Sequence, residues 1–216
     1  MSATDAQLRA QIISITQALD AAGLVPNKSG NVSCRSAGGF LITPAGVPYR
    51  DLTPADIVEL PVDGTPAGSG PRPSSEWRMH AAIYARRPEA AAVVHTHSPR
   101  ATALACAGHG IPPFHYMIAL AGGDIRCMPY ATFGTAELAA TAVHGLEGRR
   151  ATLLGNHGVI TIGSSLREAQ AVAVEIENLA TQYLAMLAAG LEPNLLDDKE
   201  LATVIGKFSD YGRLTR

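Results

Sequence analysis

Two histidines, separated by one residue, follow an apolar and β-branched run of the chain. The run covers residues 90–95, and its end reads His95-Thr96-His97. Side chains two residues apart on a strand point to the same face, so His95 and His97 can converge on one ion. Such a pair also occurs as ordinary polar residues at a strand end. Its place directly after a buried strand, where α/β proteins put their sites, favours a metal, and zinc prefers imidazole nitrogen.

A third histidine lies in a turn between two apolar segments, Gly155-Asn156-His157-Gly158. Glycine in this turn allows a close approach of the backbone, and the tight turn then fixes the direction of the His157 side chain. Three histidines with open positions are typical of a catalytic zinc ion. The sequence therefore predicts a zinc site of His95, His97 and His157, with manganese or cobalt as alternative divalent ions. Four histidines lack such a setting: His80, His109, His115 and His144. The first and last of these lie on predicted helices and are interpreted as surface or packing groups.

A carboxylate and two hydroxyls mark the start of another predicted helix. Ser74 and Ser75 come directly before Glu76. A glutamate here would, on its own, only complement the helix dipole. Two hydroxyls and free backbone N–H groups at a helix N-terminus, however, form an anion site. Loops at 30–31 and 43–46 would add amide donors in a nest suited to phosphate. The sequence therefore predicts phosphate, metal and carboxylate in one cleft.

Helices and strands interleave along the chain without strict alternation. Apolar residues recur every three or four positions over 6–22, and Gly23 ends that helix. N-caps are predicted at Ser74 or Ser75, at Thr135 and at Ser165. The last of these forms a capping box with Glu168. Further helices are expected over 76–86, 99–107, 135–146, 165–189 and 199–208, and strands over 30–35, 39–43, 57–60, 90–95, 115–120, 151–154 and 159–162.

This order of elements favours an α/β sandwich around one mixed or mainly antiparallel sheet over a doubly wound parallel sheet. With 216 residues, 47% of them hydrophobic, the chain can bury one sizeable core. No internal repeat is visible. The stretch 63–73, rich in Gly and Pro, is expected to be a surface loop rather than a linker. We therefore expect a single domain over residues 1–216.

Composition and charge exclude several classes of partner. A net charge of −2 with 17% charged residues gives no basic surface for nucleic acid or anionic lipid. No apolar run approaches the roughly 20 residues that a membrane span needs, and the first residues lack the layout of a signal peptide. Three cysteines, outside any CxxC pair, predict reduced and mostly buried thiols of a cytoplasmic protein: Cys34, Cys106 and Cys127.

A series of motifs resembles the class II aldolase/adducin superfamily, and within it the branch similar to fuculose-phosphate aldolases. The motifs run almost from end to end: GNVS at 30–33, PSSEWR.H at 73–80, RP.A.AVVH.H at 87–97, HYMIA at 115–119, PYATFGT.EL at 129–138 and ATLL..HG at 151–158. Their order and spacing are specific for the superfamily. The resemblance implies a three-layer α/β/α sandwich with a central mixed, mainly antiparallel sheet, assembled as a C4 homotetramer with active sites between subunits.

The resemblance also implies an activity. It points to a zinc-dependent aldolase that cleaves a ketose 1-phosphate of the L-fuculose 1-phosphate type to dihydroxyacetone phosphate and a small aldehyde such as L-lactaldehyde. Cleavage of 5-deoxyribulose or 5-methylthioribulose 1-phosphate is the alternative. An L-ribulose-5-phosphate 4-epimerase shares the zinc site, but the HYMIA and PYATFGT segments favour the aldolase. Adducin-like members lack the metal ligands, whereas this chain keeps the three histidines and Glu76.

Residue roles follow from the same resemblance. His95, His97 and His157 would be zinc ligands, and Glu76 would be a fourth ligand that swings away to act as general base. Tyr116 would reach into a neighbouring subunit's site as a proton donor. The C-terminal tail would help to close that site through Tyr211.

The implied phosphate site departs from the family pattern at one position. Its residues would be Asn31, Gly46, Ser74 and Ser75. Ala45 stands where family members often carry a hydroxyl residue, so one hydrogen bond to the phosphate is missing. Lys28 either compensates by its charge or is an ordinary exposed lysine.

Overall fold

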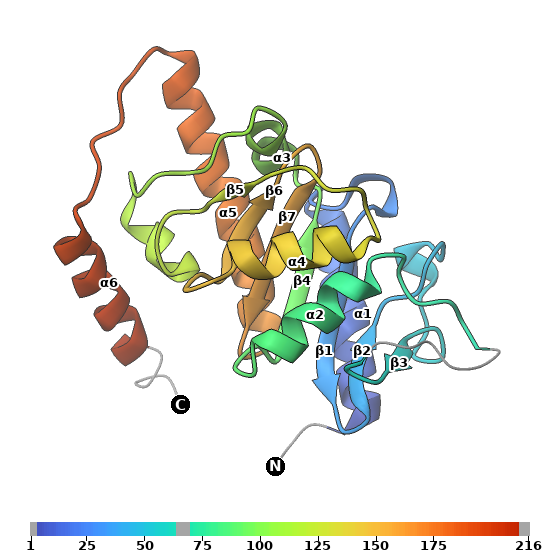
Figure 1. Cartoon of the computed structure of the whole chain (residues 1–216). Helices are drawn as coiled ribbons and strands as arrows, with labels where there is room; N and C mark the ends of the chain where they lie inside the picture. Colours follow the sequence, from blue (N-terminus) through green and yellow to red (C-terminus); the bar gives the residue numbers. More distant parts are fainter. Residues whose placement is uncertain (1–3, 64–69, 212–216) are drawn as a thin grey trace.

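A seven-stranded sheet forms the centre of the computed structural model, which describes residues 4–63 and 70–211, with side chains up to residue 208 (Figure 1). The strands are ordered β3-β2-β1-β4-β7-β6-β5. Their bounds are β1 Asn31–Ser36, β2 Gly39–Ile42, β3 Val58–Leu60, β4 Ala92–Thr96, β5 Cys127–Met128, β6 Ala151–Leu154 and β7 Gly158–Gly163. Within the described residues, neighbouring strands run antiparallel except β5 and β6, which are parallel. The predicted mixed, mainly antiparallel sheet is confirmed.

Helices cover both faces of this sheet and complete three layers (Figure 1). The helices α2 (Trp77–Arg86) and α4 (Ala136–Gly145) pack on one face, where Val93 of β4 is buried. The helices α1 (Asp5–Ala21) and α5 (Leu166–Ala188) pack on the other face, where Val94 is buried. Successive side chains of a strand point to opposite faces. The apolar run of β4 is therefore buried on both sides, and the predicted α/β/α sandwich is confirmed.

Shorter elements surround this core. The 3-10 turns η1 (Pro26–Lys28) and η2 (Tyr49–Asp51) lie in loops before β1 and β3. The helix α3 (Pro99–Cys106) and the 3-10 helix η3 (Tyr116–Ala121) pack with α5 in a further apolar cluster. The last helix, α6 (Asp198–Tyr211), follows a long connection and lies apart from the sheet (Figure 1). The ring of its Phe208 stacks on Tyr116 of η3 at 6.3 Å.

The predicted strand over 115–120 is wrong, because this segment is the 3-10 helix η3. The His115 side chain accepts a hydrogen bond from the backbone N–H of Met117 at the start of η3. Gly122, with φ of 84°, ends it. A short apolar run does not distinguish a strand from a buried helical turn by periodicity.

The predicted helix caps differ in their outcome. Thr135 and Ser165 each accept a hydrogen bond from the backbone N–H three residues later, as predicted. The predicted capping box of Ser165 and Glu168 is only half formed, because the Glu168 side chain accepts from the backbone N–H of Ser164 instead of Ser165. The predicted serine cap of α2 is wrong, because the N-cap residue is Glu76.

The described residues bear on three further expectations. All three cysteines are free, but Cys106 is exposed, which corrects the prediction of mostly buried thiols. Burial raises the pKa of the Cys34 thiol to about 12. Of the predicted surface loop, residues 64–69 lie outside the described part of the chain. Among the described helices, none combines the length and the apolar character needed to cross a bilayer.

Candidate metal centre and its cleft

Four side chains from three parts of the chain meet at one end of the sheet. His95 lies near the end of β4, His97 follows that strand, and His157 lies in the turn between β6 and β7. Because β4 pairs with β7, with Thr96 opposite Val159, this turn lies beside the end of β4. Glu76 enters from the start of α2. The ligand atoms of the four side chains all lie within 4.8 Å of one another.

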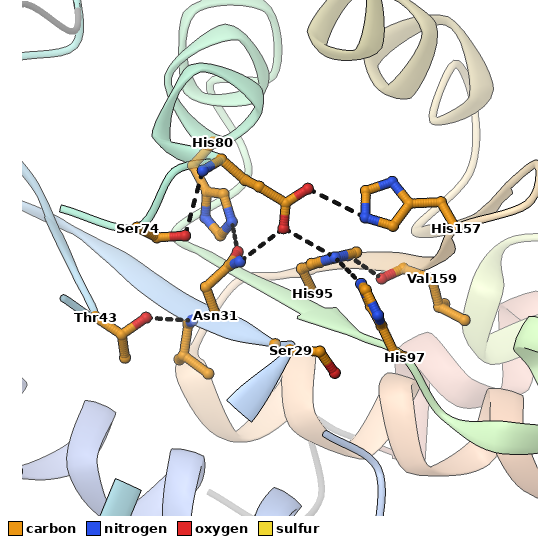
Figure 2. A network of polar contacts seen from close by, with 12 residues as sticks. Ser29, Asn31, Thr43, Ser74, His80, His95, His97, His157 and Val159 are labelled. Atoms are coloured by element: carbon orange, nitrogen blue, oxygen red, sulfur yellow. Dashed lines mark hydrogen bonds and ion pairs between the residues drawn. The ribbon is translucent and has the colours of Figure 1, made fainter. Parts of the chain in front are cut away.

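The three imidazoles face a common point (Figure 2). His95 Nε2 lies 3.0 Å from His97 Nε2 and 3.1 Å from Oε2 of Glu76. His157 Nε2 lies 3.2 Å from Oε1 of the same carboxylate. His95 Nδ1 is 2.8 Å from the carbonyl oxygen of Val159. A carbonyl only accepts, so His95 carries its proton on Nδ1, and the neutral ring turns the lone pair of Nε2 toward the other ligands.

This donor set fits a divalent metal ion. A buried lone pair that faces a second imidazole nitrogen and a carboxylate is unfavourable unless a cation lies among them. Glu76 Oε1 is buried and accepts no hydrogen bond from the described residues. The hydrogen bond from His95 to Val159 is the kind of outer contact that fixes the tautomer and orientation of a metal-binding imidazole.

The charges of the site also suit metal binding. Burial would raise the pKa of Glu76, but His95 and His157 outweigh it and hold that pKa well below its ordinary value, so the carboxylate is ionised. Burial, with His95 and His157, lowers the pKa of His97 to about 3, which keeps that ring neutral. Burial lowers the pKa of His95, but the charge and hydrogen bond of Glu76, together with the carbonyl of Val159, outweigh burial and raise that pKa when no metal is bound. Neutral imidazole and ionised carboxylate are the forms that bind a metal.

Two unusual positions hold the turn that carries His157. A Cβ on Gly158 would lie 2.4 Å from the carbonyl oxygen of Thr96 and 2.9 Å from Cδ2 of His97. The close approach expected from the sequence is therefore present, and only glycine permits it. Asn156 has a φ of 53°, in the left-handed region that asparagine tolerates better than most residues. The turn thus brings His157 against the end of β4.

A cleft of about 460 Å³ opens beside the four ligands. The hydroxyl of Tyr49 accepts from the backbone N–H of Gly30 and donates to the carbonyl of the same residue, which joins the loop before β1 to the loop after β2. The backbone N–H of Ser74 donates to Thr43, and that of Ala45 donates to Arg72. These bonds bring three loops, distant in sequence, around one space.

Most of the predicted site residues line this cleft. It is lined by Lys28, Asn31, Ala45, Gly46, Ser74, Ser75, Glu76, His97 and His157. Tyr116 is outside this lining of described residues; it is 53% exposed and stacks on Phe208 instead. Tyr211 is the last residue of α6, and its side chain lies outside the described part of the structure.

Sequence reasoning missed three contributors to the site. Tyr130 and Phe133, which are 58% and 65% exposed, form an aromatic wall of the cleft. His80, interpreted as a surface or packing group, is fully buried and forms a hydrogen bond with Asn31. A signal for His80 was present, because residues four apart at a helix start, such as Glu76 and His80, share a face.

Comparison with known proteins identifies the family. Residues 10–184 match the family described as Class II Aldolase and Adducin N-terminal domain. The chain is 49% identical over 207 residues to a 5-methylthioribulose-1-phosphate/5-deoxyribulose-1-phosphate aldolase of Rhodospirillum rubrum. The matched region covers 95% of this chain and 92% of that protein. It is 45% identical over 207 residues to the L-fuculose phosphate aldolase of Escherichia coli K12, with 95% and 96% covered.

A solved structure extends the match to the fold. An L-fuculose 1-phosphate aldolase superposes with a TM-score of 0.91 and 36% identity, over 97% of this chain and 98% of that chain. The family match, the identities and the complete set of four ligands agree. The chain belongs to the class II aldolase and adducin family, as one of its aldolases.

Proposed function

We propose that the substrate is a 5-deoxypentulose 1-phosphate, namely 5-methylthioribulose or 5-deoxyribulose 1-phosphate, cleaved to dihydroxyacetone phosphate and a small aldehyde. The sequence analysis ranks L-fuculose 1-phosphate first and these substrates second. The reversal of this order rests on one observation. The chain is 49% identical to the 5-methylthioribulose-1-phosphate/5-deoxyribulose-1-phosphate aldolase of Rhodospirillum rubrum and 45% identical to the L-fuculose phosphate aldolase of Escherichia coli. The aromatic wall of Tyr130 and Phe133 suits the apolar end of such a substrate, a methyl or methylthio group, although the methyl end of L-fuculose 1-phosphate would fit it as well.

The phosphate of the substrate is proposed to bind in the loops of the cleft. Ser74 and Ser75 offer hydroxyls there, and Lys28 offers a positive charge. Asn31 gives one amide N–H to Glu76 and keeps its second N–H for a ligand. The backbone N–H of Ala45 is already bonded to Arg72, so the amide of Gly46 is the proposed donor from that loop.

Cleavage of the C3–C4 bond requires two proton transfers. The 4-hydroxyl loses its proton, the electron pair of the C3–C4 bond moves toward the C2 carbonyl, and C3 then takes a proton. His95, His97, His157 and Glu76 would hold a divalent metal ion, zinc by ligand type, which would supply a Lewis acid for the negative charge that develops on the substrate. We assign the transfer at C3 to Glu76, which would leave the metal to act there, and the transfer at the 4-oxygen to Tyr116 of a neighbouring subunit.

The assignment of Tyr116 requires an assembly. Its ring lies outside the described cleft lining of its own chain, beside α6. We infer that residues 1–216 act as one domain within a C4 homotetramer. In this tetramer Tyr116 and Tyr211 of one subunit would complete the cleft of the next.

The substrate is tested by measuring release of dihydroxyacetone phosphate from three ketose phosphates side by side. These are the 1-phosphates of 5-methylthioribulose, 5-deoxyribulose and L-fuculose. The proposal predicts a higher kcat/KM for the first two than for L-fuculose 1-phosphate. The His95→Ala protein, prepared in parallel, should release none. A preference for L-fuculose 1-phosphate, or no release from any of the three, would contradict the proposal.

A further inference from the structure

Five buried polar side chains form a continuous chain behind the metal centre. Asn31 and Ser33 lie two residues apart on β1, whereas Glu76, His80 and Tyr84 lie four apart at the start of α2 and along it. A spacing of two on a strand, or of four on a helix, keeps side chains on one face. The two elements therefore turn polar faces toward each other. Each of the five residues is at most 5% exposed.

One end of this chain fixes the direction of every hydrogen bond in it. The ionised carboxylate of Glu76 only accepts, so Asn31 Nδ2, 3.0 Å from Oε2, donates to it. Asn31 Oδ1 then accepts from His80 Nε2, 2.5 Å away (Figure 2). A neutral His80 with its proton on Nε2 keeps its lone pair on Nδ1, which accepts from the Ser33 hydroxyl at 2.6 Å. The Ser33 oxygen accepts in turn from the Tyr84 hydroxyl at 2.7 Å.

The opposite tautomer of His80 would break this order. With the proton on Nδ1, the lone pair of Nε2 would face Asn31 Oδ1, and two acceptors would be in contact. Rotation of the Asn31 amide would relieve that contact, but it would turn the Asn31 carbonyl toward the Glu76 carboxylate. A buried acceptor that is left without a donor destabilises the folded state. The orientation of Asn31 on Glu76 therefore depends on which nitrogen of His80 carries the proton.

We propose that His80 is a positioning residue: with its proton on Nε2, it holds the Asn31 amide so that Asn31 fixes one oxygen of Glu76. Oε2 then has a neutral donor in a set position, while Oε1, which lies 3.2 Å from His157 Nε2 and accepts no hydrogen bond from the described residues, is the oxygen left to exchange a proton. The catalytic part of this inference rests on the proposed role of Glu76.

The tautomer is tested in the metal-free protein by long-range 1H–15N NMR of the histidine side chains, with His80→Gln used to assign the His80 signals. The expected result is a neutral ring with its proton on Nε2. A proton on Nδ1, or a charged ring at neutral pH, would overturn the proposal. The tautomer is read from the unaltered protein, and the substitution serves only to assign the signals.

The functional consequence is tested with two amides at position 80. The amide nitrogen of Gln reaches the place of Nε2, whereas the amide of Asn reaches only the place of Nδ1. His80→Gln should retain the hydrogen bond to Asn31 and stay close to the unaltered protein. His80→Asn should lose it and lower kcat roughly 10–100-fold, with a smaller change in KM, because partners of metal ligands act on this scale. Zn2+ affinity is measured by competition with a chromophoric chelator. It should be close to that of the unaltered protein in His80→Gln and lower in His80→Asn.

The two readouts separate the inference from the proposed function. If no ketose phosphate is cleaved but Zn2+ affinity is kept in His80→Gln and lost in His80→Asn, the positioning role stands and the proposed function fails. Equal Zn2+ affinity and equal kcat in the two variants, with similar thermal stability, would overturn the role of His80.

Discussion

Glu76 combines burial with a negative charge, and its surroundings account for both. It is 5% exposed at the start of α2. Its Oε2 is close to Asn31 Nδ2 and His95 Nε2, while its Oε1 faces His157 Nε2. Since the carboxylate contacts the ligands of the metal and lines the cleft, it can exchange protons with a bound substrate.

Glu76→Gln preserves the shape of this side chain and removes its charge. We expect the fold and much of the bound zinc to be retained, whereas turnover should fall by about 100-fold or more, as expected when a general acid–base group is lost. Release of dihydroxyacetone phosphate and metal content per chain are measured on the same preparation. A near-normal rate in this variant would remove Glu76 from the mechanism.

The residues of the metal centre differ in how far the sequence predicts them. His95 and His97 are separated by one residue, and His157 has glycine beside it, so local spacing is enough. The contacts of Asn31 with Glu76 and with His80 join residues 45 and 49 positions apart. Such pairings depend on how α2 lies across β1, which no local pattern in the chain specifies.

At the scale of elements, the close contact between the β6–β7 turn and the end of β4 determines where His157 and His97 meet. Gly158→Ala would place a methyl group 2.4 Å from the carbonyl oxygen of Thr96. Because backbone cannot move aside cheaply, we expect weaker Zn2+ binding and a lower midpoint of thermal unfolding. Zn2+ binding is measured by titration with zinc, and the midpoint of unfolding is measured by circular dichroism.

The control for this substitution is Gly206→Ala in α6. A Cβ at Gly206 would meet nothing within 4 Å, and alanine favours a helix over glycine. Zn2+ affinity should therefore be unchanged in Gly206→Ala. Equal affinities in the two alanine variants would contradict the importance of the close contact.

The start of α3, directly after His97, is held by another helix. Ser98 is the N-cap residue but makes no capping hydrogen bond with its side chain in the described structure. Glu177 of α5 instead accepts from the backbone N–H groups of Arg100 and Ala101. This contact explains how α3 begins without the usual cap, and it ties the segment after β4 to α5.

Removing this carboxylate should destabilise the fold. Glu177→Ala is expected to lower the free energy of unfolding by about 0.5–2 kcal/mol, the range for loss of a helix cap. Urea unfolding followed by circular dichroism measures it. Glu175→Ala is the matched control, since in the described structure the side chain of Glu175 accepts a hydrogen bond from the exposed Asn178. An equal effect of both substitutions would show that Glu177 does not hold α3.

Prediction from the sequence succeeds for elements with strong periodicity or caps and fails where the signal is short. The helices that begin after Thr135 and Ser165 are found within a residue or two. The two-residue strand β5 has no signal of its own, since it exists only by pairing with β6. The helix η3 has an apolar run that fits a strand equally well.

At the scale of the whole molecule, Tyr116 lies beside α6, at 6.3 Å from the ring of Phe208, and outside the described lining of the cleft. We proposed that it completes the site of a neighbouring subunit. Neither the sequence nor one chain specifies such an assembly, because the contacting surfaces belong to different copies.

Shared sites predict complementation between inactive subunits. His95→Ala should abolish activity through the metal, and Tyr116→Phe should lower it strongly through the neighbouring site. Mixed by co-expression in equal amounts, they should form tetramers in which about one quarter of the sites are complete, because each site draws on two subunits. Recovery of about that fraction of the normal rate supports sharing, and a rate no higher than that of the separate variants contradicts it.

The most direct test of the metal-dependent aldolase is a titration of its activity with zinc. Protein stripped of metal by a chelator is supplied with increasing equivalents of Zn2+, and release of dihydroxyacetone phosphate from 5-methylthioribulose 1-phosphate is followed at each step. With one ion bound by His95, His97, His157 and Glu76, the rate should start near zero and rise linearly to a plateau at one equivalent per chain. A full rate in the metal-free protein, or no rate at any amount of zinc, would contradict this function.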